Sequence, residues 1–151
     1  MNPAQPQPAS TTPNPKEDIS TYLRLHEKLF KEAKEEYAKG DLIQAGEKLW
    51  GAVTSLLNAI VETRGWKHEN HRDYYIIVKN LFKETGDAEL LTCLKMAEGL
   101  HTNFYHNFMD KEDFEKHGDC ALKLINKLKR IHKYHLTYRY PHPTNPITQN
   151  T

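Results

Sequence analysis

The sequence lacks any long apolar run and has few cysteines. No stretch of about 18 apolar residues occurs among the 151 residues, which argues against a membrane-spanning helix. The first residues mix Pro, Gln, Ser and Thr without the basic and then apolar order of a signal peptide, so we expect a cytoplasmic protein without membrane contact. Cys93 and Cys120 have no CxxC context and fall within helical apolar patterns. We expect them to be buried free thiols rather than a disulfide.

Strand patterns and the common catalytic motifs are also lacking. No segment alternates strictly between apolar and polar residues, so the sequence predicts no sheet. No glycine-rich phosphate loop occurs, and nothing in the pattern positions a Ser or Cys nucleophile. The pairs His68/His71 and His132/His135 have the spacing of metal ligands but no predictable third ligand. We therefore expect no cofactor and no metal.

Apolar residues instead recur every three or four positions in five segments, which is the period of amphipathic helices. Glycine stop signals and Asp or Asn caps separate these segments. The expected helices are 16–39, 41–64, 71–85 capped by Asn70, 87–108, and a last one that starts after Asp110. Short links predict an all-α, up-and-down bundle over residues 16–135, with a disordered tail at 1–15 and an extended tail at 136–151.

Two glycines stand inside the second expected helix. Gly46 and Gly51 lower its helix propensity, so they indicate that another backbone, in the same chain or in a partner, comes close to this helix.

The charge of the chain is unevenly distributed. No Asp or Glu follows Asp119, whereas six Lys and Arg residues do. Such a basic end can attract phosphate groups, and it can equally complement the dipole at a helix carboxyl end. The candidate nucleic-acid contacts are Lys127, Lys129, Arg130 and Lys133.

The segment from Glu98 to Phe108 places two histidines, two asparagines and a tyrosine in what otherwise reads as a core helix. Buried polar groups need partners. One interpretation is that His101 is a core histidine hydrogen-bonded by a neighbour such as Glu47, and the other is that His101, Asn103 and Tyr105 contact a ligand.

Several short motifs follow one another along the chain. These are Gly40-Asp41 with Gln44-Ala45, Glu47-Lys48-Leu49-Trp50-Gly51-Ala52, Arg64-Gly65-Trp66 with His71-Arg72-Asp73, and Leu100-His101 with Asn103-Phe104-Tyr105. Their order and spacing resemble the PaREP family of archaeal proteins over roughly residues 29–128. The resemblance implies membership of the wider HEPN group, whose up-and-down helical bundles are frequently homodimers. HEPN relatives include metal-independent ribonucleases, toxins paired with nucleotidyltransferases, and non-catalytic RNA- or nucleotide-binding proteins.

The resemblance also implies a candidate catalytic set. HEPN ribonucleases use an arginine, a polar residue and a histidine, and the nearest counterpart here is His101, Asn103 and His106. Histidine thus replaces the arginine, which loses a permanent bidentate charge for phosphate. His101 and His106 lie roughly 140° apart around a helix, so they converge only across a distorted turn or a second subunit. The further candidate binding residues are Glu47, Lys48, Trp50, Arg72, Glu98 and Tyr105, although Trp50 fits the core and Lys48 and Arg72 fit ion pairs or solvent.

The leading functional hypothesis is therefore non-catalytic binding of RNA, a nucleotide or a protein partner, in a system like a toxin–antitoxin pair with a nucleotidyltransferase. One alternative is a metal-independent ribonuclease in which His106 is the acid or base and Asn103 orients phosphate. A second is a purely structural homodimer through the glycine-bearing helix or its neighbours.

Overall fold

The computed structural model describes residues 15–66 and 73–139, apart from the side chains of residues 15–16, 134, 135 and 137–139. Within these residues the chain is helical and contains no strand, which confirms the all-α prediction. The helices are α1 Pro15–Ala38, α2 Leu42–Arg64, α3 Tyr74–Thr85, α4 Glu89–His106 and α5 Lys111–Arg139. The described residues contain no helix that is both long and apolar enough to cross a bilayer.

The predicted turns are confirmed where local chemistry determines them. Asp41 accepts a hydrogen bond from the backbone N–H of Gln44 at 3.0 Å and so caps α2. Gly65 ends the same helix at a φ of 66°, a left-handed conformation that glycine adopts without strain. Asp110 accepts from the N–H of Asp113 at 2.7 Å and caps α5.

Predicted boundaries of three helices are wrong, and α4 spans Glu89–His106 instead of 87–108. The side chain of Asp73 caps α3, which begins at Tyr74 instead of residue 71, and the expected cap Asn70 lies outside the described residues. α5 continues to Arg139, so the extended tail predicted from residue 136 begins as helix. Asp and Asn are both good caps, and the sequence alone did not rank them.

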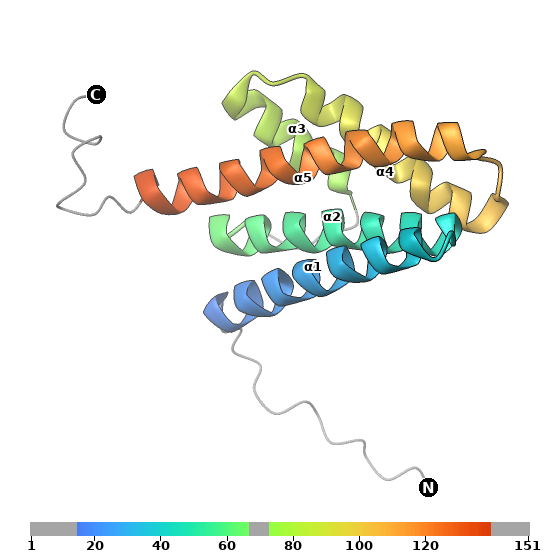
Figure 1. Ribbon diagram of the computed structural model, residues 1–151. Helices are drawn as coiled ribbons and strands as arrows, with labels where there is room; N and C mark the ends of the chain where they lie inside the picture. Colours follow the sequence, from blue (N-terminus) through green and yellow to red (C-terminus); the bar gives the residue numbers. More distant parts are fainter. Residues whose placement is uncertain (1–14, 67–72, 140–151) are drawn as a thin grey trace, which may run out of the picture.

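α2 forms the centre of the fold. It packs directly against α1, α4 and α5, and in Figure 1 it lies between α1 and α5 along much of its length. Eleven of its residues are buried, including Leu56, Leu57 and Ile60. α3 joins the core mainly through α4. A helix in this central position presents different faces to different neighbours, so α2 contributes residues to two separate surfaces.

The two glycines of α2 allow close packing, as predicted, but it is side chains of the same chain that approach them. A Cβ at Gly46 would meet Phe114 at 3.2 Å, and a Cβ at Gly51 would meet Leu29 at 2.9 Å. Gly51 therefore brings α1 close to α2. The same helix pair is joined by His26, whose Nδ1 donates to the carbonyl of Ala52 at 2.7 Å. His26 is only 1% exposed, and this burial lowers its pKa.

Candidate functional site

His101 and Glu47 form a hydrogen-bonded pair between α4 and α2. The Nδ1 of His101 donates to the Glu47 carboxylate, 2.8 Å from Oε2 and 3.1 Å from Oε1. This contact confirms Glu47 as the partner of His101, but the prediction of a core histidine is wrong, because the His101 side chain is 38% exposed. A carboxylate on Nδ1 fixes the tautomer with the proton on that nitrogen, which makes Nε2 the acceptor when the ring is neutral.

Aromatic rings surround this pair on two sides. Trp50 stacks on the His101 ring at 5.9 Å between centroids, and Tyr105 meets the same ring edge-on at 5.3 Å. Tyr74 of α3 packs edge-on against Trp50 at 5.9 Å. We call Glu47, Trp50, Tyr74, His101 and Tyr105 the His101 cluster. His101 and Glu47 remain partly accessible, and Tyr105 is 68% exposed.

The three candidate catalytic residues do not meet at one point. Asn103 is buried, and its Oδ1 accepts from the backbone N–H groups of Phe108 and Met109 at 2.8 and 2.9 Å. It therefore fixes the turn that follows α4, where Asn107 adopts a φ of 44°. His106 is exposed at the last residue of α4, away from the His101–Glu47 pair around the helix. A catalytic role for the three residues stays a prediction that the arrangement does not favour.

The other candidate binding residues add little positive charge to the cluster. Lys48 donates to Glu32 at 2.9 Å, as predicted for a paired lysine, and this bond lowers the pKa of the Glu32 carboxyl. Glu98 is exposed on α4, and Arg72 lies outside the described residues. The described residues around His101 therefore do not form a phosphate site, because the acid Glu47 contacts the ring and Lys48 is paired with Glu32.

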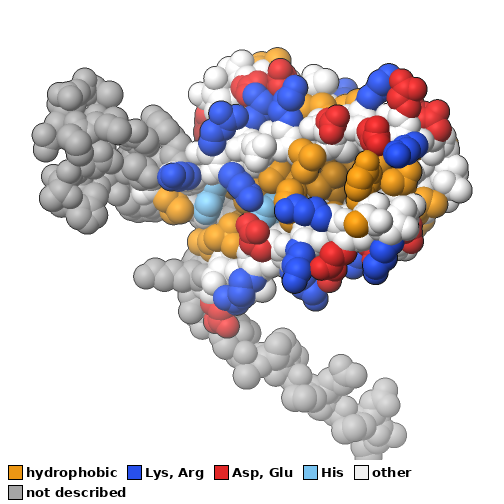
Figure 2. Space-filling view, in the orientation of Figure 1, with side chains coloured by type: hydrophobic (Ala, Val, Ile, Leu, Met, Phe, Trp, Pro, Cys, Tyr) orange, Lys and Arg blue, Asp and Glu red, His pale blue; other side chains and the backbone are white. Residues whose placement is uncertain are grey.

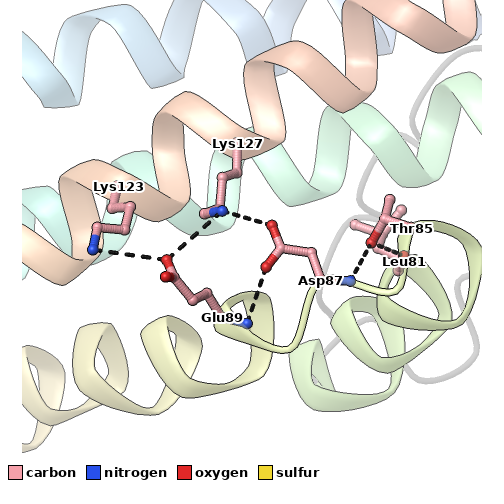
Figure 3. A network of polar contacts seen from close by, with 6 residues as sticks. All are labelled: Leu81, Thr85, Asp87, Glu89, Lys123 and Lys127. Atoms are coloured by element: carbon pink, nitrogen blue, oxygen red, sulfur yellow. Dashed lines mark hydrogen bonds and ion pairs between the residues drawn. The ribbon is translucent and has the colours of Figure 1, made fainter.

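Lys127 forms ion pairs with acidic residues of the same chain. Its Nζ lies 2.6 Å from Oδ2 of Asp87 and 3.7 Å from Glu89, and Lys123 also reaches Glu89 at 3.7 Å (Figure 3). Asp87 in turn accepts from the N–H of Glu89 at 3.1 Å. The hydrogen bond between Lys127 and Asp87 raises the pKa of the lysine and lowers that of the carboxyl. This network, which Figure 3 shows at the α3–α4 turn, anchors α5 to the start of α4.

The remaining candidate nucleic-acid contacts differ in their environments. Lys129 lies 3.6 Å from the Glu27 carboxylate and over the ring of Phe30, so it joins α5 to α1. Arg130 and Lys133 are exposed on α5.

The described residues contain no cluster of three or more His, Cys, Asp or Glu suited to a metal ion. His68 and His71 lie outside them, as does the side chain of His135, so the two histidine pairs stay untested. Cys93 and Cys120 are free thiols, and burial together with the neighbouring Cys120 raises the pKa of Cys93 to about 12. Cys93 is thus an unreactive thiol at neutral pH.

A second surface lies on the other side of α2. Between α1 and α5 the structure has an apolar hollow of about 400 Å³, which we call the α1–α5 slot. Figure 2 shows apolar side chains gathered in a band between α5 above and α1 below. Small residues Ala33, Ala45 and Gly118 help to line the slot and leave space in it. Its other lining residues are Phe30, Lys34, Tyr37, Leu49, Phe114, Glu115, Asp119 and Leu122.

Two contacts between α1 and α5 limit the length of the slot. The ion pair of Glu27 with Lys129 lies near the Phe30 end. At the other end the hydroxyl of Tyr37 donates to Glu115 at 3.0 Å. The two α1 residues are ten positions apart, which corresponds to about 15 Å of helix. The two contacts therefore mark the ends of the slot, which stays open to solvent between them.

Sequence reasoning did not find this slot. Its walls come from α1 and α5, which are far apart in the chain, and periodicity does not say how two such helices lie across a third. The available signal was Ala33 and Gly118, two small residues on faces that otherwise carry large apolar ones.

The comparisons with known proteins agree with the motifs in the sequence. The model of the archaeal PaREP1/PaREP8 family matches residues 21–125, from α1 into α5. No curated protein and no solved structure gives a significant match. Because the matched range covers most of the chain and nearly all of the helical core, the protein belongs to the archaeal PaREP1/PaREP8 family.

Proposed function

We propose that this protein is a non-catalytic binding protein whose site is the α1–α5 slot. The observation that carries the proposal is the slot itself, an accessible apolar hollow of about 400 Å³ bounded at both ends. Binding sites are typically concave, mostly apolar and provided with a few polar groups at the edge. The slot has this composition, with Lys34 and Asp119 among its lining residues.

The His101 cluster supports catalysis less well. Asn103 is committed to the turn after α4, and His106 points elsewhere, so an acid and a base do not converge beside His101. The ribonuclease alternative is thus supported only by the presence of two histidines and an asparagine in the sequence, and not by their arrangement.

A filling substitution tests the proposal. Ala33 is 7% exposed and lines the slot, so Ala33→Phe should occupy the space that a ligand would take. The probe is Nile red, an uncharged apolar dye that fluoresces when it leaves water. We expect the wild type to bind the dye and Ala33→Phe to weaken binding at least roughly 10-fold, because a phenyl ring takes the place of the ligand.

The matched control is Ala38→Phe, which adds the same ring to an exposed position at the end of α1. It should bind the dye as the wild type does. Circular dichroism shows whether each variant is folded. If Ala33→Phe fails to fold, Gly118→Ala replaces it, because a Cβ there would lie 4.0 Å from Leu49 in ordinary contact. Dye binding that is absent in the wild type, or unchanged in the folded slot variants, would overturn the proposal.

RNA or nucleotide binding is the second candidate function. It is supported by Tyr105, which is 68% exposed beside His101, and by the exposed cations Arg130 and Lys133. A filter-binding assay with single-stranded RNA tests it: the double variant Arg130→Ala/Lys133→Ala should reduce both affinity and its salt dependence. If the double variant retains RNA on the filter as the wild type does, Arg130 and Lys133 of α5 do not contact RNA.

We also propose, from the sequence resemblance, that the fold is HEPN-like, that the protein acts in the cytoplasm, and that it forms a homodimer or pairs with a nucleotidyltransferase. The succession of helices with short links supports the first point. Sedimentation equilibrium of the full chain tests whether the protein forms a homodimer. Co-purification with a nucleotidyltransferase encoded nearby tests whether the protein pairs with that enzyme.

A further inference from the structure

The mouth of the α1–α5 slot carries opposite charges on its two rims. Lys34 lies on the α1 rim, and Glu115 and Asp119 lie on the α5 rim. The Nζ of Lys34 sits 4.3 Å from the centre of the Phe30 ring, so a cation–π contact holds the ammonium beside the hollow. Glu115 already accepts from Tyr37, whereas Asp119 is exposed. Within the described residues, no ion pair joins Lys34 or Asp119 to another side chain.

This charge arrangement discriminates between classes of ligand. A ligand with charge of one sign is attracted by one rim and repelled by the other. A helix laid along the slot meets both rims at once, because its two flanks face α1 and α5 separately. If acidic residues line one flank and basic residues the other, each rim finds a charge of opposite sign.

The dimensions of the slot agree with a helix as well. About 15 Å separates the two bounding contacts, and apolar residues at positions i, i+4 and i+7 of a helix span about 10.5 Å. The small residues Ala33, Ala45 and Gly118 provide the space into which such side chains insert. The three surrounding helices α1, α2 and α5 would then pack with the added helix as a four-helix unit.

We propose that the α1–α5 slot binds an amphipathic helix of a partner protein. This helix presents large apolar residues at i, i+4 and i+7, an acidic flank toward Lys34 and a basic flank toward Asp119. The inference rests on the proposed function, since it names the occupant of the same site.

Three synthetic helical peptides test the inference with the full chain. All share one leucine stripe at i, i+4 and i+7; the first has one Glu flank and one Lys flank, the second has two Glu flanks, and the third has two Lys flanks. Fluorescence anisotropy measures their affinities. The mixed peptide should bind tightest, by roughly 2- to 5-fold over each peptide with a mismatched flank, as expected for exposed charge pairs.

Charge reversal on the protein should change the order of affinities. Lys34→Glu makes both rims acidic, so the Lys-flanked peptide should become the tightest ligand. The double variant Glu115→Gln/Asp119→Lys makes both rims basic and keeps an acceptor for Tyr37, so the Glu-flanked peptide should become the tightest. Lys28→Glu is the matched control on α1, because Lys28 is exposed and does not line the slot, and it should leave the order unchanged. A merely structural role of Lys34 or Asp119 would not invert a peptide preference.

The outcomes separate this inference from the proposed function. One outcome is that Ala33→Phe abolishes peptide binding while the charge-reversal variants keep the wild-type order of affinities. This outcome would overturn the inference of a helix with charged flanks, and the slot would remain an apolar binding site. Dye binding without binding of any peptide does the same. Self-association of the wild type that Ala33→Phe abolishes would identify a second copy as the occupant and overturn the inference. Peptide and dye binding that both ignore Ala33→Phe would overturn the inference and the proposed function together.

Discussion

The two surfaces beside α2 differ in how their polar groups are used. In the His101 cluster, the imidazole donates to Glu47, Trp50 covers the ring, and the nearby Asn103 is bound to two backbone N–H groups. At the α1–α5 slot, apolar walls remain open and Lys34 and Asp119 have no ion-pair partner among the described side chains. The residues that a catalytic motif would use therefore lie where most polar groups already have partners, although Tyr105 is exposed, whereas mainly apolar residues surround the hollow of the slot.

The largest effect should come from the common hydrophobic core, which includes Leu56 together with Ala33 and Leu49 of the slot and Leu100 next to His101. Leu56 of α2 is 1% exposed, and Leu56→Ala removes buried methyl groups and leaves a cavity. We expect a loss of about 2–5 kcal/mol of unfolding free energy, measured by urea denaturation. Both the dye site and the His101–Glu47 contact should weaken as the protein loosens. A loss below about 1 kcal/mol would mean that the two sides of α2 are not held by a common core.

Asn103→Ala should have the next largest effect. The substitution leaves the N–H groups of Phe108 and Met109 without their acceptor, so we expect a loss of about 1–3 kcal/mol in the same assay. Asn107→Gly is the control, because its φ of 44° suits glycine, and it should change stability little. Full stability of Asn103→Ala would show that the amide is free for a ligand, which would narrow the difference between the two surfaces.

The pH dependence of stability should report on the α1 side of the fold. Burial lowers the pKa of His26 below its ordinary value of 6.5, so on acidification the unfolded chain takes up this proton before the folded one. The contribution of neutral His26 is complete above about pH 6.5 and is lost as the pH falls below that value. The carboxyls of Glu32 and Asp87, whose pKa values are lowered, act only below about pH 4.5.

Urea midpoints between pH 7.5 and 5 measure this effect. His26→Gln can still donate to the Ala52 carbonyl, so it should remain folded and flatten the decline. An identical decline in the variant would contradict the assignment to His26.

The smallest effect should come from the His101 cluster itself. Glu47→Gln keeps an acceptor for His101 Nδ1 but removes the charge, and both side chains are partly exposed. We expect a loss of about 0.2–1 kcal/mol and unchanged dye binding. Weaker dye binding in Glu47→Gln would show that the His101 cluster contributes to binding at the slot. The two surfaces would then be one site.

The sequence predicted the features that depend on neighbouring residues or on a buried polar group that needs a partner. Asp41, Gly65 and Asp110 act as expected because a cap or stop is decided within one turn. The contact between His101 and Glu47 was also predicted, since a histidine on a core helix requires an acceptor close by.

What could not be predicted depends on how distant helices lie against each other. Ala33 and Gly118 line the slot only because α1 and α5 cross α2 at a certain separation, and no local pattern determines that separation. The use of Lys127 was missed for the same reason: the candidate phosphate contact finds Asp87 forty positions away in the chain. The cap of α3 was misplaced because two suitable residues, Asn70 and Asp73, lie close together.

The two contacts that bound the slot respond differently to the solution. Glu27 with Lys129 is an ion pair between side chains that are 68% and 44% exposed, and dissolved ions screen such a pair. Tyr37 with Glu115 is a hydrogen bond from a neutral hydroxyl, on which screening has less effect. Raising the ionic strength should therefore loosen the Phe30 end while the Tyr37 end stays closed, so the length of ligand accepted by the protein should increase from one end only as the medium becomes more saline.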